Sequence, residues 1–177
     1  MRKAGIAVAA ALAWAAPAHA ADLATIGCVA QKVDAAVRSQ IEADVERNLT
    51  ESGKRPSYGP GVGAGLKTAA AACAKEHGWT AAAASAAARY TLAKIGMPVA
   101  QRVITQRGFD PAALEDQFQA LPEETRNRPL TAQESQGLVR DAAIEDVQKT
   151  RENAELLSEF FAFVGTIQYA AFEFSAA

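Results

Sequence analysis

The sequence predicts an all-α protein, and two observations carry this prediction. Alanine is abundant along the whole chain, and alanine is the best helix former because it loses no side-chain entropy when a helix forms. Valine, isoleucine and threonine are scattered, and no window keeps the apolar–polar alternation of a strand between two turn signals. We therefore expect a single-domain bundle of five to six helices over residues 21–177.

The first twenty residues have the pattern of a secretory signal peptide. Arg2 and Lys3 precede an apolar run over residues 4–16, and small residues flank His19 at the end of the segment. A basic start, an apolar stretch of about 7–15 residues and a small-x-small site are typical of an export signal. The run is shorter than the roughly 20 apolar residues of a transmembrane helix. We expect cleavage after Ala20 and a periplasmic or secreted mature protein.

The first expected helix runs from Leu23 to Thr50. An apolar residue recurs every four positions within it, at Val29, Val33, Val37, Ile41, Val45 and Leu49. A strict four-residue repeat drifts by about 40° per step around a helix of 3.6 residues per turn. The apolar stripe therefore winds around the helix and meets different neighbours along its length. Glycines and prolines between Gly53 and Gly65 then form the longest breaker segment of the chain.

Four further helices are expected, each bounded by a glycine, a proline or an N-cap residue. Their expected ranges are 64–77, 80–95, 99–106 and 110–120. Glycines follow the first three ranges, at Gly78, Gly96 and Gly108. Asp110 is a suitable N-cap residue and Pro111 suits the first helical position. Gly96 and Pro98 are expected to separate the second and third of these helices.

The last and longest expected helix follows a loop at residues 121–129. Thr131 and Glu134 have the spacing of a capping box. From there the helical pattern continues to about Phe172, with Gly137 and Gly165 as the positions where it is expected to break.

The C-terminal part of this helix is rich in aromatic residues and free of charge between Glu159 and Glu173. It contains half of the twelve aromatic residues, namely Phe160, Phe161, Phe163, Tyr169, Phe172 and Phe174. A helix that is apolar on most sides is usually the core helix of its own bundle. The alternatives are a docking surface or one wall of an apolar pocket, with Phe160, Phe163, Tyr169 and Phe172 as the candidate binding residues. Burial at the ends of the run is expected to shift the pKa of the two flanking glutamates.

Cys28 and Cys73 are the two cysteines of the chain. An even number of cysteines in an exported protein predicts a disulfide. Cys28 lies near the start of the first expected helix and Cys73 near the end of the second, so a bond between them requires antiparallel helices. We therefore expect a disulfide-tied N-terminal helical hairpin, in which the glycine- and proline-rich segment folds back along the first helix.

Glu51-Ser52 and the glycines that follow resemble a motif of the lytic transglycosylases of the lysozyme superfamily. That family carries a helix-ending Glu-Ser, a loop and then Gly-Ala-x-Gly-Leu, and residues 63–66 here read Gly-Ala-Gly-Leu. The resemblance implies that Glu51 is a general acid and that the glycines let the backbone approach a glycan. It covers residues 51–66, and Lys67 and Thr68 stand where the family carries methionine and glutamine.

The sequence predicts no metal ion, no cofactor and no nucleic-acid partner. His77 is the one histidine of residues 21–177, and no Cys-x-x-Cys-His motif for covalent haem is present. Leu66 interrupts the Gly-Lys-Thr triplet that a phosphate-binding loop requires. Loss of Arg2 and Lys3 with the signal peptide changes the formal net charge from −2 to −4. A mildly acidic chain without a basic tract has no electrostatic footprint for nucleic acid.

The sequence alone leaves the function open, and it favours binding over catalysis. The leading hypothesis is a non-catalytic protein-binding module of the inhibitor, immunity or adaptor type, with another envelope protein as its partner. The alternatives are a carrier or sensor of an apolar small molecule and a cell-wall-active enzyme similar to lytic transglycosylases. A flat or convex surface with one apolar patch would favour the first hypothesis, and an enclosed cavity lined by the C-terminal aromatics would favour the second. A groove with a partly buried Glu51 would favour the third.

Overall fold

The computed structural model describes residues 20–177, and the regular structure in this part of the chain is entirely helical. The α-helices are α1 (Cys28–Lys32), α2 (Ala35–Thr50), α3 (Pro60–His77), α4 (Ala81–Gln106), α5 (Pro111–Gln119), α6 (Glu123–Arg126), α7 (Ala132–Ala142) and α8 (Arg151–Ala176). Two short 3-10 helices, η1 (Leu23–Thr25) and η2 (Asp146–Gln148), complete the order. The all-α prediction is confirmed. The expected signal peptide lies outside the described residues, apart from Ala20.

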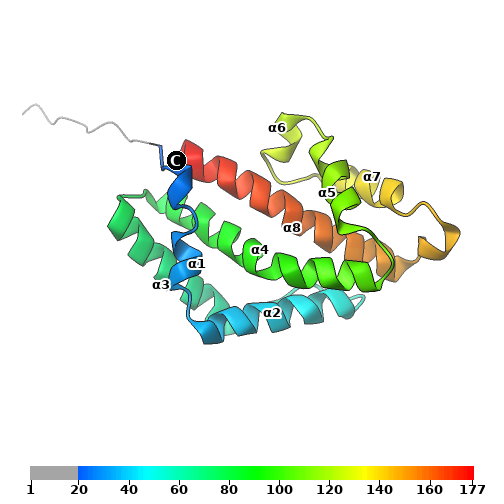
Figure 1. The fold of residues 1–177 in the computed structure, drawn as a ribbon, viewed down its shortest axis with the longest axis horizontal. Helices are drawn as coiled ribbons and strands as arrows, with labels where there is room; N and C mark the ends of the chain where they lie inside the picture. The colour runs from blue at the N-terminus through cyan, green and yellow to red at the C-terminus, as the bar shows by residue number, and fades with distance from the viewer. Residues whose placement is uncertain (1–19) are drawn as a thin grey trace, which may run out of the picture.

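Helices α4 and α8 form the centre of the molecule and run side by side over most of their length (Figure 1). Helices α2 and α3 pack against α4, and α5, α6 and α7 pack against α8. On α8, the rings of Phe160, Phe161 and Phe174 are completely buried. Each such side chain contributes about 1.5–3 kcal/mol through burial. The aromatic-rich helix is therefore the core helix of the fold.

The first expected helix is broken, which corrects the prediction of one element from Leu23 to Thr50. The chain passes from η1 to α1 and then turns at Val33 and Asp34, where both residues have extended backbone angles. Arg38 fixes this corner because its guanidinium donates a hydrogen bond of 2.8 Å to the Ala30 carbonyl. The chain changes direction at this turn, so the apolar residues on both sides of it face the core. Val29 before the turn and Ile41 after it are both completely buried.

The helices expected at residues 80–95 and 99–106 are a single helix, α4, which corrects the expected break at Gly96 and Pro98. Thr80 caps it as expected, with its hydroxyl accepting a hydrogen bond from the Ala83 N–H at 3.1 Å. Gly96 is buried inside the helix, where it allows a close helix–helix contact. Packing against α2 on one side and α8 on the other keeps α4 continuous through the exposed Pro98.

The expected long helix from Thr131 is divided into α7 and α8, and the break lies at residues 143–150 instead of at Gly137 or Gly165. The capping box of Thr131 and Glu134 is confirmed at the start of α7. Helix α8 begins with its own cap, because the Thr150 hydroxyl accepts a hydrogen bond from the Asn153 N–H at 3.1 Å.

The disulfide between Cys28 and Cys73 is confirmed, with a Cα–Cα distance of 6.0 Å. It joins the short helix α1 to the last turns of α3. The second expected helix begins at Pro60, earlier than the predicted start at Ala64, because proline occupies the first helical position. The hairpin is therefore tied through α1 and not through the long helix that was expected.

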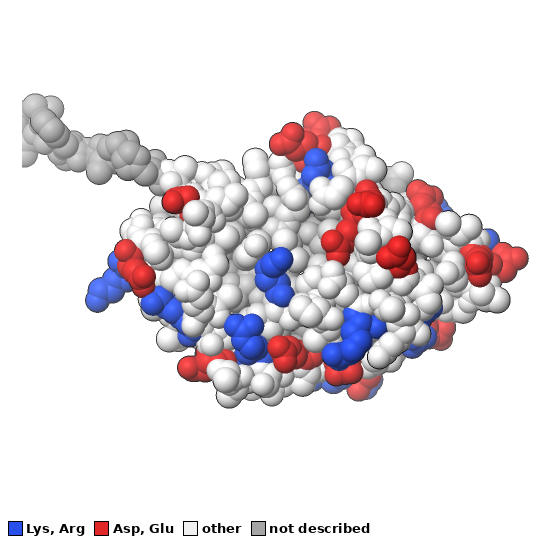
Figure 2. All heavy atoms as spheres, viewed as in Figure 1, with Lys and Arg blue, Asp and Glu red and all other residues white. Residues whose placement is uncertain are grey.

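Charged side chains of both signs are interspersed over the face shown in Figure 2, and acidic groups predominate where α5, α6 and α7 lie. Within residues 20–177, no helix has the length and apolar character needed to cross a membrane.

Candidate functional site

Two surface features hold the residues with functional potential. The first, which we call the polar cleft, lies between the loop after α2 and the first turns of α8 and has a volume of about 430 Å³. Its walls carry several charged groups, including Glu51, Lys54, Arg55, Arg151, Glu155 and Glu159. The second, which we call the α3–α4 groove, is an open apolar depression of about 670 Å³.

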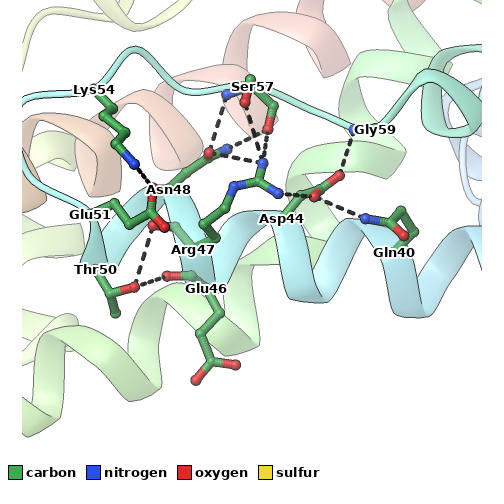
Figure 3. Close-up of polar contacts among 10 residues, drawn as sticks. All are labelled: Gln40, Asp44, Glu46, Arg47, Asn48, Thr50, Glu51, Lys54, Ser57 and Gly59. Carbon is green, nitrogen blue, oxygen red and sulfur yellow. Dashed lines mark hydrogen bonds and ion pairs between the residues drawn. The ribbon is translucent and has the colours of Figure 1, made fainter.

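A hydrogen-bond network on α2 holds the loop that forms one wall of the polar cleft (Figure 3). The guanidinium of Arg47 donates to the Ser57 carbonyl at 2.6 Å. Asn48 forms two hydrogen bonds with Ser57. Its side-chain amide donates to the Ser57 carbonyl at 3.0 Å, and its side-chain oxygen accepts from the Ser57 N–H at 3.1 Å. The loop folds back along α2 as the sequence predicted, and polar side chains of α2 fix it there.

Asp44 is the buried centre of this network. Its carboxylate accepts hydrogen bonds from the Gly59 N–H at 2.7 Å, from the Gln40 amide at 2.9 Å and from Arg47 at 2.5 Å. Burial alone would raise the pKa of Asp44, but the hydrogen bonds and the positive charge of Arg47 outweigh it and hold the pKa below its usual range. Asp44 is therefore an ionised, fully hydrogen-bonded structural group. It fixes the start of α3 relative to α2.

Glu51, the candidate general acid, lies at the C-terminal end of α2 and is exposed at the polar cleft. The Lys54 ammonium donates a hydrogen bond of 2.8 Å to its carboxylate. This hydrogen bond, together with the positive charge of Lys54, lowers the pKa of Glu51. A general acid at neutral pH needs the opposite shift, because it must hold a proton before the reaction.

Glu159 of α8 is the glutamate of the polar cleft whose environment favours the protonated form. Its side chain is half-buried, and this burial raises its pKa, as expected for a glutamate at the end of the uncharged aromatic run. Burial also raises the pKa of the neighbouring Tyr58 to about 12, with the negative charges of Glu159 and Asp44 adding to the effect. The other flanking glutamate, Glu173, forms an ion pair with Arg89.

The candidate aromatic residues do not come together into a binding pocket. Phe160 and Phe163 are buried in the core, whereas Phe172 is 48% exposed. Tyr169 is half-buried and lines, with Phe161, a hollow of about 200 Å³ that is open to solvent. This hollow lacks the enclosed, aromatic-lined shape expected for a carrier of an apolar small molecule.

The α3–α4 groove is built from small residues at helical spacing. Helix α3 contributes Gly63, Leu66, Lys67, Ala70, Ala71 and Ala74, and helix α4 contributes Ala81, Ala84, Ser85, Ala88, Arg89 and Leu92. Because alanine side chains fill little volume, the two helices leave an apolar depression between them. Both charged residues of the lining, Lys67 and Arg89, are cationic. The sequence analysis did not predict this groove, although alanines recur at helical spacing in both segments that form it.

The chain matches no model of a known protein family, and neither a characterised protein nor a solved structure is detectably similar to it.

Proposed function

We propose that the protein is a non-catalytic protein-binding module that receives an amphipathic helix of a partner protein in the α3–α4 groove. The groove itself is the observation that carries the proposal. Exposed apolar surface that is bordered by polar or charged residues is a candidate interaction site. A helix that lies in a groove presents apolar side chains at helical spacing along one face.

The small residues of the groove suit a helical partner. Two helices pack with their axes about 8–10 Å apart, and the distance depends on the side chains at the contact. Ala71 and Ala84, on opposite sides of the groove, allow a third helix to approach closely. Alanine also loses no side-chain entropy when it becomes buried. The groove therefore offers apolar area at little entropic cost.

The charges at the groove define the partner further. Within the described part of the chain, Lys67 forms no ion pair, and Arg89 is paired with Glu173. A partner helix with carboxylates beside its apolar face would complement Lys67 and would compete with Glu173 for Arg89. We infer an acidic amphipathic helix of another exported or envelope protein as the occupant, with this protein periplasmic or secreted.

Affinity capture with two matched variants tests the proposal. Ala71→Glu places a carboxylate inside the groove, whereas Ala72→Glu places the same group on the neighbouring exposed residue of α3, which does not line the groove. Immobilised wild-type protein and Ala72→Glu are expected to retain the same envelope protein, and Ala71→Glu is expected to lose it. Equal retention by both variants would contradict the proposal.

The polar cleft supports a second candidate function, a cell-wall-active enzyme, because its lining includes Glu51, whose pKa is lowered, and Glu159, whose pKa burial raises. Pairs of carboxyl groups whose environments separate their pKa values are typical of acid–base catalysis. In this case Glu159 would be the proton donor and Glu51 the ionised partner. Release of soluble fragments from peptidoglycan by the wild-type protein, and its loss in Glu159→Gln, would establish this function in place of the first.

A further inference from the structure

Four side chains with metal-ligating atoms gather around the disulfide, and we call them the α3 cluster. The ligating atoms of Cys28, Glu76 and His77 all lie within 4.8 Å of one another. The fourth member, Cys73, is bonded to Cys28. Cys73, Glu76 and His77 have i, i+3 and i+4 spacing on α3, so they lie on one face of that helix.

In the oxidised protein this cluster cannot serve as a metal site. Only a thiolate is a good sulfur ligand, and both sulfurs are committed to the disulfide. Glu76 is also engaged, since its carboxylate forms an ion pair of 2.8 Å with Lys32. Reduction of the disulfide would change the donor set from a carboxylate and an imidazole to two thiolates, a carboxylate and an imidazole.

We propose that reduction of the Cys28–Cys73 disulfide turns the α3 cluster into a zinc site with Cys28, Cys73, Glu76 and His77 as its ligands. A dithiol supplies the two electrons. One of its thiolates attacks Cys28, which is the less buried of the two residues, and releases Cys73; the second thiol then displaces Cys28 and closes the oxidised dithiol. Each cysteine thiol loses its proton to solvent when it binds Zn²⁺.

Three of the four proposed ligands already lie near one another, namely Cys28, Glu76 and His77. Zinc–sulfur bonds of about 2.3 Å and zinc–nitrogen or zinc–oxygen bonds of about 2.0–2.2 Å place neighbouring ligand atoms about 3.3–3.8 Å apart. The ligating atoms of Cys28, Glu76 and His77, which now lie up to 4.8 Å apart, would reach these separations through side-chain rotation, and Cys73 would join them from its place beside Cys28. Once the disulfide bond is broken, the two sulfurs are free to move apart. The metal would then replace the disulfide as the cross-link between α1 and α3.

Cobalt spectroscopy on residues 21–177 tests this inference, because Co²⁺ bound to thiolates in a tetrahedral site has charge-transfer bands in the near ultraviolet and visible bands at long wavelength. Protein reduced with a phosphine, which adds no competing thiol, is expected to show these bands with one equivalent of Co²⁺ and to lose them when Zn²⁺ is added. Oxidised protein is expected to show neither. Absence of the bands in the reduced protein would overturn the inference.

Matched variants identify the ligands. His77→Gln and Glu76→Gln are each expected to raise the Kd for Zn²⁺ at least 10-fold in competition with a chromophoric chelator, whereas Lys75→Gln, on an exposed neighbour outside the cluster, leaves it unchanged. Circular dichroism follows the fold at the same time. If the reduced protein loses helicity, Zn²⁺ is expected to restore it in the wild type and not in His77→Gln. Equal Kd values for His77→Gln and the wild type, or no recovery of helicity with Zn²⁺, would contradict the assignment.

Discussion

Gly96 of α4 lies directly against the ring of Phe163 of α8. A Cβ atom at Gly96 would stand 2.7 Å from Cε1 of Phe163 and 2.9 Å from Cγ2 of Val45, which belongs to α2. Both distances are shorter than an ordinary van der Waals contact. The absence of a side chain at this position therefore allows α2, α4 and α8 to meet.

Gly96→Ala is expected to lower the free energy of unfolding by about 1–3 kcal/mol, because the added methyl group overpacks the contact with Phe163. Gly137→Ala is the matched control, since the nearest atom to its new Cβ is the end of the Arg140 side chain at 3.9 Å. The free energy of unfolding of Gly137→Ala is expected to rise by about 0.5–1 kcal/mol, because alanine has a better helix propensity than glycine. Urea unfolding of both variants measures the difference, and a stabilising Gly96→Ala would contradict the packing described here.

Phe161→Ala is expected to lower the free energy of unfolding by about 3–5 kcal/mol, because this ring is completely buried in the core. Phe172→Ala, which removes a ring that is 48% exposed, is expected to cost much less. Thermal unfolding followed by circular dichroism compares the two. Similar losses would show that the aromatic helix is not the core element.

Replacement of both Cys28 and Cys73 by alanine is expected to lower the free energy of unfolding by about 3–4 kcal/mol in the chain-entropy model for a loop of this size. The two cysteines are separated by 45 residues. Thiol titration of the denatured wild-type protein without reductant is expected to find no free thiol. Two titratable thiols would contradict the disulfide.

Asp44 is expected to make the protein sensitive to acid. Its pKa is lower in the folded than in the unfolded protein, so its contribution to stability is present above the unfolded pKa of about 3.9 and is lost as the pH falls through the folded value. The wild type is expected to lose more stability than Asp44→Asn between about pH 5 and pH 2. Urea unfolding at several pH values measures this difference, and parallel curves for the two proteins would contradict it.

Glu159 is expected to make the protein less stable at neutral pH than at acid pH. Burial raises the pKa of Glu159 in the folded protein and so favours its protonated form. The stability that this protonated form contributes is lost as the pH rises through the folded pKa. Glu159→Gln is therefore expected to raise the melting temperature at pH 7 and to leave it unchanged near pH 4. Glu152→Gln, on an exposed residue of the same helix, serves as the control. A melting temperature at pH 7 that does not rise in Glu159→Gln would show that burial does not disfavour the charge.

Features that depend on adjacent residues were predictable from the sequence. The caps at Thr80, Asp110 and Thr131 are of this kind. The disulfide joins distant residues, but it was predictable because the chain has only two cysteines. The continuity of α4 was not predictable, because a glycine after a helical stretch indicates either a helix end or a close contact. Phe163, far along the chain, decides between the two.

The candidate sites were likewise predictable only where neighbouring residues in the chain determine them. The sequence identified Glu159 as a glutamate that burial would shift, since its aromatic neighbours are adjacent in the chain. The local surroundings of Glu51 depend on Lys54 in the folded loop, which the motif did not reveal. The α3–α4 groove was missed because alanine favours helix formation equally in buried and in exposed positions.

Photo-cross-linking from Ala71 tests the central claim, binding of a partner helix in the α3–α4 groove, most directly. A photoreactive amino acid is placed at Ala71 or, as a control, at Ala72, and the products formed in the cell envelope are mapped by mass spectrometry. We predict that Ala71, and not Ala72, forms a cross-link to one protein, at a segment with apolar residues at helical spacing and flanking carboxylates. Equal products from both positions, a segment without this pattern, or a cross-link from Ala71 to a second copy of this chain would contradict the account.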